Sequence, residues 1–264
     1  MPHYNPQSRG FVDSRFFLYL CIIRKHKKIS MTKRNKTPYL ATFSPEMTLF
    51  ELVESSPSLL GVLSRLNVRL PFGDVTVAEM CQREGMDVAL FLTICSMHAD
   101  PSFRPSADLL ITDMLAGVTA YLRASHRYYA EYMLPHTEAH LDRILAHCDT
   151  LSQSALHSFY NNYSRYIVAH FEEEERNIFA LSENPDSVTE ADCSIFDMPH
   201  AEIDDCSNDI ASLVFKNLPE SAPTPLRCAL LDHIYALRDD LRRHSDIEAY
   251  LLRPLVEKLI AQKR

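Results

Sequence analysis

Two short segments decide the fold of this chain. They are His-Phe-Glu-Glu-Glu-Glu-Arg-Asn-Ile-Phe at positions 170–179 and His-Ser-Asp-Ile-Glu at positions 244–248, which share the pattern His-x-x-x-Glu. On an α-helix, a spacing of four residues puts both side chains on one face. Imidazole nitrogen and carboxylate oxygen together suit iron, manganese or zinc, and a carboxylate can bridge two metals. Two such pairs indicate two metals, although one pair alone is weak evidence in a chain with 12 histidines.

The spacing of the other candidates tests whether they meet at one level. In an antiparallel hairpin, residues at equal height are symmetric about the loop. Three pairs satisfy this condition, each with its midpoint in a predicted break between helices. His126 and Glu174 are symmetric around the break at 149–152, His170 and His200 around the break at 182–187, and His200 and His244 around the break at 217–225. The sequence therefore predicts a metal site with six ligands on four successive helices: His126, His170, Glu174, His200, His244 and Glu248.

Composition supports an all-α fold. The 264 residues are 46% hydrophobic and include only five glycines, so the chain can bury a core but has few tight-turn residues. Short breaks between long amphipathic stretches make neighbouring helices antiparallel. We predict an up-down-up-down four-helix bundle over residues 108–264, preceded by a small helical domain.

The chain divides into four parts by its sequence pattern. We expect residues 1–45 to be an N-terminal extension that is disordered or is a misassigned start, since Met31 opens a more ordinary sequence. Residues 46–100 contain three short amphipathic patterns and should form a compact helical domain. The two prolines of segment 101–107 suit an extended linker before the bundle.

Charge and cysteine content exclude several classes of protein. The net charge is −8, and no basic face follows the N-terminal stretch, so nucleic acid is not an expected partner. The longest uncharged apolar run, 16–23, is too short to span a membrane, and its basic residues follow it, unlike those of a secretory signal. Seven scattered cysteines suggest reduced thiols in a cytoplasmic protein.

The remaining histidines do not fit the predicted centre. On a continuous helix, His136, His140 and His147 lie about 15, 20 and 30 Å from His126 at 1.5 Å per residue. We expect these three, and also His157 and His233, to be surface histidines or histidines with ordinary hydrogen-bond partners.

The ligand pattern resembles that of the hemerythrin-like cation-binding domain, and most closely its repair-of-iron-centres (RIC or ScdA-type) branch. Segment 170–179 is similar to the family's H-x-x-x-E-E-x-x-L-F, and segment 244–254 to its H-x-x-x-E-x-x-x-L-x-P. Segment 48–98 is similar to the small N-terminal domain of that branch. One departure is that Leu70-Pro71 stands before Gly73, where better-known members have a Cys-Cys pair.

The resemblance implies a non-haem di-iron centre, oxo-bridged, that binds dioxygen or nitric oxide. It also implies an iron-donating protein of the nitrosative and oxidative stress response, with iron–sulfur proteins as recipients, rather than a conventional enzyme. A homodimer is left open. Two alternatives remain at this point: a sensor or carrier of dioxygen or nitric oxide that transfers no iron, and a helical interaction module. Iron donation is the preferred function, but because the Cys pair is missing, it is preferred over sensing by a smaller margin.

Overall fold

The computed structural model describes residues 39–69, 71–180 and 201–262. Within these ranges the chain consists of helices joined by turns and loops, without a strand, which confirms the all-α prediction. His200, the break at 182–187 and most of the N-terminal extension lie outside the described residues.

Four short helices form the N-terminal helical module. They are α2 (Leu49–Ser55), α3 (Leu59–Arg65), α4 (Val77–Glu84) and α5 (Val88–Ala99). Capping boxes start α2 at Thr48 and α4 at Thr76. The stretch 77–94, the third of the three amphipathic patterns, is thus two helices. Gly85, at φ +66°, ends α4 in the left-handed region, and the Asp87 side chain then caps α5.

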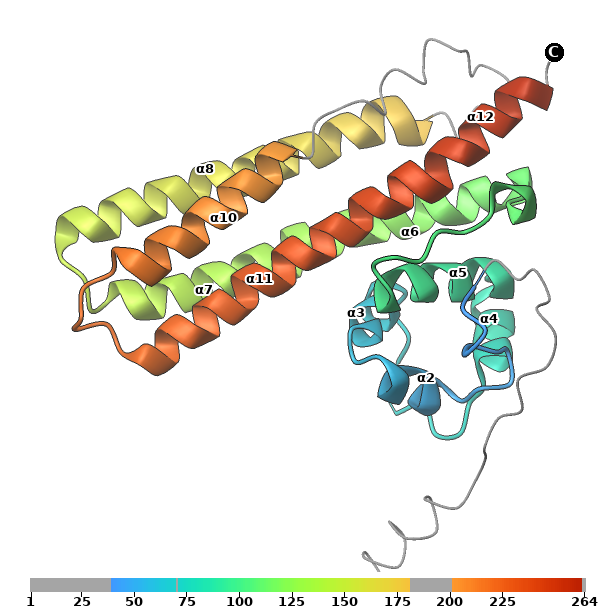
Figure 1. The fold of residues 1–264 in the computed structure, drawn as a ribbon, viewed down its shortest axis with the longest axis horizontal. Coiled ribbons are helices and arrows are strands. Elements are labelled where there is room, and N and C mark those ends of the chain that lie inside the picture. The colour runs from blue at the N-terminus through green and yellow to red at the C-terminus, as the bar shows by residue number, and fades with distance from the viewer. Residues whose placement is uncertain (1–38, 70, 181–200, 263–264) are drawn as a thin grey trace, which may run out of the picture. The chain divides into compact units, whose positions relative to one another are not determined.

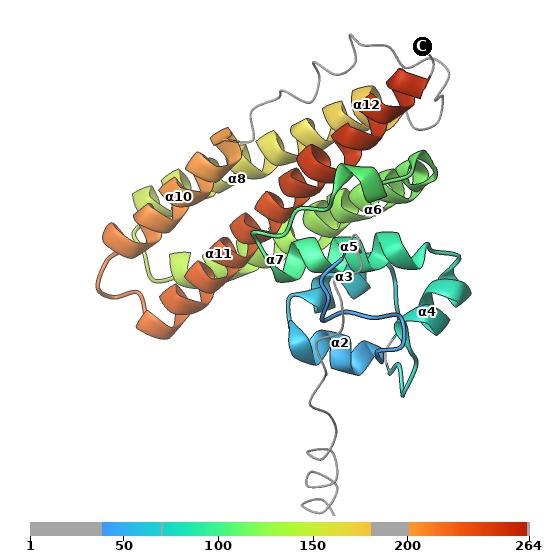
Figure 2. The same cartoon turned by 45° about the vertical axis from the view of Figure 1, so that its right-hand side comes forward.

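The bundle is made of longer helices that lie side by side in both views (Figure 1, Figure 2). The 3-10 turns η1 (Ala107–Leu109) and η2 (Thr112–Met114) lead into it. Its helices are α6 (Leu115–Tyr128), α7 (Leu134–Leu145), α8 (Thr150–Glu174), α10 (Ala201–Lys216), α11 (Thr224–Ile247) and α12 (Arg253–Gln262). The chain reverses direction between α7 and α8 and again between α10 and α11, as the first and third breaks predict.

Local chemistry explains both turns. The Asp149 side chain accepts hydrogen bonds from the backbone N–H groups of Leu151 and Ser152, which starts α8. At the other turn, Pro223 precedes α11 and Pro225 lies in its first turn, where a missing N–H costs nothing. No described helix has both the length and the uncharged apolar surface that crossing a bilayer requires.

Three π-helical turns interrupt the long helices. They are η3 (Tyr129–Met133) between α6 and α7, η4 (Glu175–Phe179) after α8, and η7 (Glu248–Leu252) between α11 and α12. A π turn widens the helix locally by one residue, and such turns often occur at functional sites.

The buried apolar residues form two clusters. One joins the N-terminal helical module to the end of the bundle that contains Phe179 and Leu251, and the other fills the end that contains Phe171 and Leu241. The module also contacts the bundle through Arg65, whose guanidinium is buried, pairs with Asp240 on α11 and donates a hydrogen bond to the Tyr129 hydroxyl at 3.2 Å. The polar residues described next lie between the two apolar clusters.

Candidate metal centre

Four buried polar side chains from four helical elements meet in the bundle. His126 comes from α6, Glu174 from the end of α8, His244 from α11 and Glu248 from the start of η7. Their ligand atoms all lie within 4.8 Å of one another. Each of the four residues is between 1% and 4% exposed. Charged groups are rarely buried to this degree unless they are paired or bind a metal.

Glu174 lies at the middle of this group. Its Oε1 is 2.9 Å from Nε2 of His170, one turn earlier on α8. Its Oε2 is 3.2 Å from Nε2 of His126 and 4.0 Å from Nε2 of His244. Each oxygen of one carboxylate therefore faces a different imidazole, which is the arrangement that a carboxylate bridging two metal ions needs.

The ring of His126 is held in one orientation. It stacks on Phe171, with ring centroids 4.1 Å apart, and on Phe179, at 5.1 Å. Its Nδ1 lies 2.9 Å from Oε1 of Glu175, so this carboxylate favours the tautomer in which Nδ1 donates and Nε2 keeps its lone pair for the site. Histidines that bind metals commonly donate their second N–H to a carboxylate in this way.

His244 connects Glu248 to the rest of the group. Its Nε2 is 3.2 Å from Oε1 of Glu248 and 3.0 Å from Nε2 of His126. Burial alone would lower the pKa of His244, but Glu248 and Glu174 outweigh it and raise the pKa to about 9. The two carboxylates thus need a positive charge beside them, which is a proton in the metal-free chain and which a metal cation would supply instead.

These observations fit a bound transition metal. Two carboxylates and the imidazoles of His126 and His244 converge within one buried space, and this mixed nitrogen and oxygen set suits iron, manganese or zinc. The Nε2 atoms of His126 and His244 face each other at hydrogen-bonding distance, where a cation could accept a lone pair from each. The Glu175 carboxylate at Nδ1 of His126 is the second hydrogen-bond partner that metal-binding histidines commonly have.

The structure brings together five of the six residues predicted from the sequence. His126, Glu174, His244 and Glu248 form the compact group, and His170 adjoins it through Glu174. His200 lies outside the described residues. Glu175 was not among the predicted site residues, since an acidic run on a helix is usually solvated, although the motif H-x-x-x-E-E includes it.

The π turns lie next to these residues. Glu174 ends α8 at the start of η4, Glu248 is the first residue of η7, and His126 lies three residues before η3. The turn at η4 carries Glu175 and Phe179, both of which contact His126. The wider backbone at η4 therefore includes the residues that orient the His126 ring.

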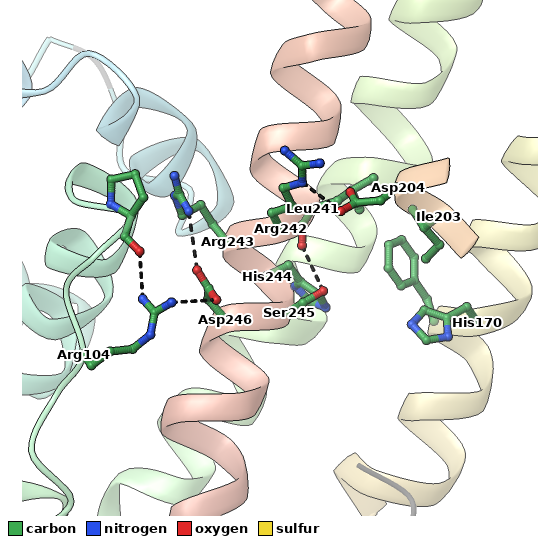
Figure 3. Close-up of a pocket in the computed structure, with 12 residues that line it drawn as sticks. Arg104, His170, Ile203, Asp204, Leu241, Arg242, Arg243, His244, Ser245 and Asp246 are labelled. Carbon is green, nitrogen blue, oxygen red and sulfur yellow. Dashed lines mark hydrogen bonds and ion pairs between the residues drawn. The ribbon is translucent and has the colours of Figure 1, made fainter. Parts of the chain in front are cut away.

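A pocket of about 400 Å³ leads to the site from the surface, and His170 and His244 are among its lining residues (Figure 3). Two ion pairs lie on its wall: Arg242 with Asp204, at 2.8 Å, and Arg104 with Asp246, at 3.3 Å. A small molecule or an ion could reach the histidines by this route without unfolding of the bundle.

The other histidines differ in their surroundings. His147 is exposed, and Nε2 of His157 is 3.2 Å from Asp142, as expected for surface residues. Three more, His136, His140 and His233, are also exposed or half-buried, and they lie close enough together to form a group of their own.

Comparison with known proteins gives one match. The model of the family described as the hemerythrin HHE cation binding domain matches residues 117–256, which is more than half of the chain. That range includes every residue of the buried site. No curated protein and no solved structure matches the chain.

Proposed function

Because the chain belongs to the hemerythrin HHE cation-binding family, we propose that its buried site holds a non-haem di-iron centre. The observation that carries this proposal is the convergence of His126, Glu174, His244 and Glu248 in the bundle, with His170 on the far oxygen of Glu174. The proposed ligands are His126, His170, Glu174, His200, His244 and Glu248.

The residues around the centre have separate tasks in this proposal. Glu174 and Glu248 would supply carboxylate oxygens and neutralise part of the charge of the ions, and the histidines would supply imidazole nitrogens. Glu175 fixes the tautomer of His126, and Phe171 holds its ring in place. The iron pair, when bound, supplies redox chemistry and open positions for a diatomic ligand such as dioxygen or nitric oxide.

We propose further that the protein supplies iron to iron–sulfur proteins whose clusters have been damaged by nitrosative or oxidative stress. The similarity of segments 170–179 and 244–254 to the repair-of-iron-centres branch supports this role. The pocket at His170 and His244 supports it too, because iron that is to be delivered needs an exit. Six protein ligands for two ions leave open positions through which a recipient's ligands can compete.

Two buried cysteines of the N-terminal helical module do not replace the Cys pair that is missing from this chain. Cys81 and Cys95, in the N-terminal helical module, are buried, and burial raises the pKa of Cys81 to about 12. Neither thiol is therefore a reactive thiolate at neutral pH. In this proposal, iron delivery uses the bundle site and its pocket rather than thiol chemistry at these two cysteines.

The first experiment measures iron per chain and the visible spectrum of protein purified without air, before and after exposure to air and to nitric oxide. We expect about two irons and a spectrum that changes on exposure.

The double variant Glu174→Ala, Glu248→Ala should remain helical, because both changes favour helix propensity, but bind no iron. The matched control is Glu172→Ala, Glu173→Ala, two exposed residues of the same acidic run. Retention of two irons by the first variant would refute the ligand assignment.

The second experiment separates iron supply from sensing. An iron–sulfur enzyme stripped of its cluster is mixed with iron-loaded protein, a reductant and a sulfide source, and recovery of enzyme activity is followed. We expect recovery with the wild type and with the control variant but not with Glu174→Ala, Glu248→Ala. No recovery from a protein that holds two irons and responds to nitric oxide would contradict iron supply and leave sensing or transport.

A further inference from the structure

A second group of histidines lies on the bundle away from the buried centre. His136 and His140 are one turn apart on α7, and His233 comes from α11. The ring centroids of His140 and His233 are 4.1 Å apart, and that of His136 is 5.7 Å from the first and 5.5 Å from the second. His136 is exposed and the other two are half-buried, so the group faces solvent.

The positions of these rings suit shared coordination of one ion. One nitrogen from each ring can be chosen so that all three lie within 4.8 Å of one another. Two nitrogens on a tetrahedral zinc ion, each at about 2.1 Å, are about 3.4 Å apart. Rotations of these exposed or half-buried side chains would bring the nitrogens to that separation.

The chemistry of the group selects a class of metal. All three donors are imidazoles, a set that suits zinc, copper or nickel better than magnesium or calcium. Burial and the neighbouring histidines lower the pKa of both His140 and His233, so these rings keep their lone pairs at neutral pH. Among the charged neighbours, Arg143 lowers the pKa of His140 further, while Asp232 acts in the opposite direction on the pKa of His233.

We propose that His136, His140 and His233 form a second metal site that binds one divalent cation of the zinc class, with water at the fourth position. The site is distinct from the buried centre, because His233 precedes His244 by eleven residues on α11, about 16 Å along the helix. Three protein ligands and an open position make it an exchangeable site.

Binding has a structural consequence. The ion would cross-link α7 to α11, two helices that pack against each other but are far apart in the sequence. Since the metal binds the folded chain better than the unfolded one, it should raise the melting temperature in proportion to the logarithm of its concentration.

The test uses the full chain as purified and Zn²⁺ alone as the probe. Zinc bound per chain is measured by equilibrium dialysis over a range of Zn²⁺ concentrations, together with iron per chain and the melting temperature. For the wild type we expect one added zinc, unchanged iron and a higher melting temperature. For His140→Ala, His233→Ala we expect at least tenfold weaker zinc binding, the same iron content and no thermal shift.

Two further variants complete the design. His147→Ala removes an exposed histidine just beyond α7 that is not in the group, and it should bind zinc as the wild type does. His136→Gln changes only an exposed side chain, so it tests the site even if the double variant folds poorly, and it should also weaken zinc binding at least tenfold. Unchanged zinc binding in His136→Gln, or an equal loss in His147→Ala, would overturn the proposal.

Discussion

The two histidine groups share helix α11 but differ in burial and charge. At the buried centre, His244 is 3% exposed and lies against two carboxylates that are 1% and 4% exposed. At the surface group, His136, His140 and His233 face solvent, and no carboxylate among the described residues joins them as a candidate ligand. Both groups offer at least two imidazoles from different helices, so the number of histidines does not separate them.

The difference lies in what each group needs when the metal is absent. Buried carboxylates are costly unless a positive charge is close, so the centre requires a cation or a proton in every state. Neutral imidazoles at a surface are satisfied by water, and the surface group is stable without an ion. We therefore expect the centre to retain its metal through purification and the surface group to exchange its metal with the solution.

The largest expected effect comes from comparing one histidine of each group on the helix that they share, α11. His244→Ala should weaken iron binding by more than about 100-fold and destabilise the fold by about 3–5 kcal/mol, because Glu174 and Glu248 lose a buried positive partner. His233→Ala, at the half-buried position, should leave iron unchanged and alter stability by no more than about 0.5 kcal/mol. Iron analysis and urea unfolding of both variants check this prediction, and equal effects in the two would remove the contrast.

A smaller effect is expected at the carboxylate behind His126. Glu175→Ala should weaken iron binding by about 10- to 100-fold, because the His126 ring loses the partner that fixes its tautomer. Glu175→Gln keeps a hydrogen-bond acceptor and should recover part of the loss, while Glu172→Ala, at an exposed neighbour, should have no effect. Competition with an iron chelator gives the affinities. An equal loss in the alanine and glutamine variants would assign Glu175 a role through charge alone.

Much of the bundle could be predicted from the sequence. Helical rise is constant and the loops at 149–152 and 217–225 are short, so sequence distance converts to height, and His126 and Glu174 indeed meet. The π turns could not be predicted, because a shift in backbone hydrogen bonds has no residue-type signature. The pairing of Arg65 with Asp240 also could not, since it depends on how the N-terminal helical module packs on α11.

The surface group was missed although the sequence carried a signal for it. Reflecting His140 through the three breaks of the bundle leads to about position 234, one residue from His233. Height alone would still not have shown that these side chains lie on adjacent faces of α7 and α11, which depends on the rotation of each helix.

The pH dependence of metal binding should differ between the groups. Metal binding at the centre has to displace the proton from His244, whose pKa is raised to about 9, so affinity should fall by up to tenfold for each pH unit below 9. At the surface group, the lowered pKa values of His140 and His233 predict zinc affinity that changes little between pH 7 and pH 8.5. Calorimetry in buffers of different ionisation enthalpy measures the protons released. Equal proton release from both groups at pH 7.5 would contradict the contrast.

The smallest expected effect concerns the ring that supports the surface group. Tyr132 stacks on His136, with centroids 5.3 Å apart and planes 20° from parallel, although Tyr132 is itself 54% exposed. An aromatic pair contributes about 0.5–1.5 kcal/mol, and exposure places this one at the low end, so Tyr132→Leu should weaken zinc binding about two- to threefold. Tyr235→Leu removes an exposed tyrosine of α11 that stacks on Arg238 instead, and it should not change zinc binding. Neither variant should alter iron content, because the buried centre is held by Glu175 and Phe171 rather than by surface rings. A loss of iron in Tyr132→Leu would show that the two groups are coupled through η3, and the comparison between an independent buried centre and an independent surface site would no longer hold.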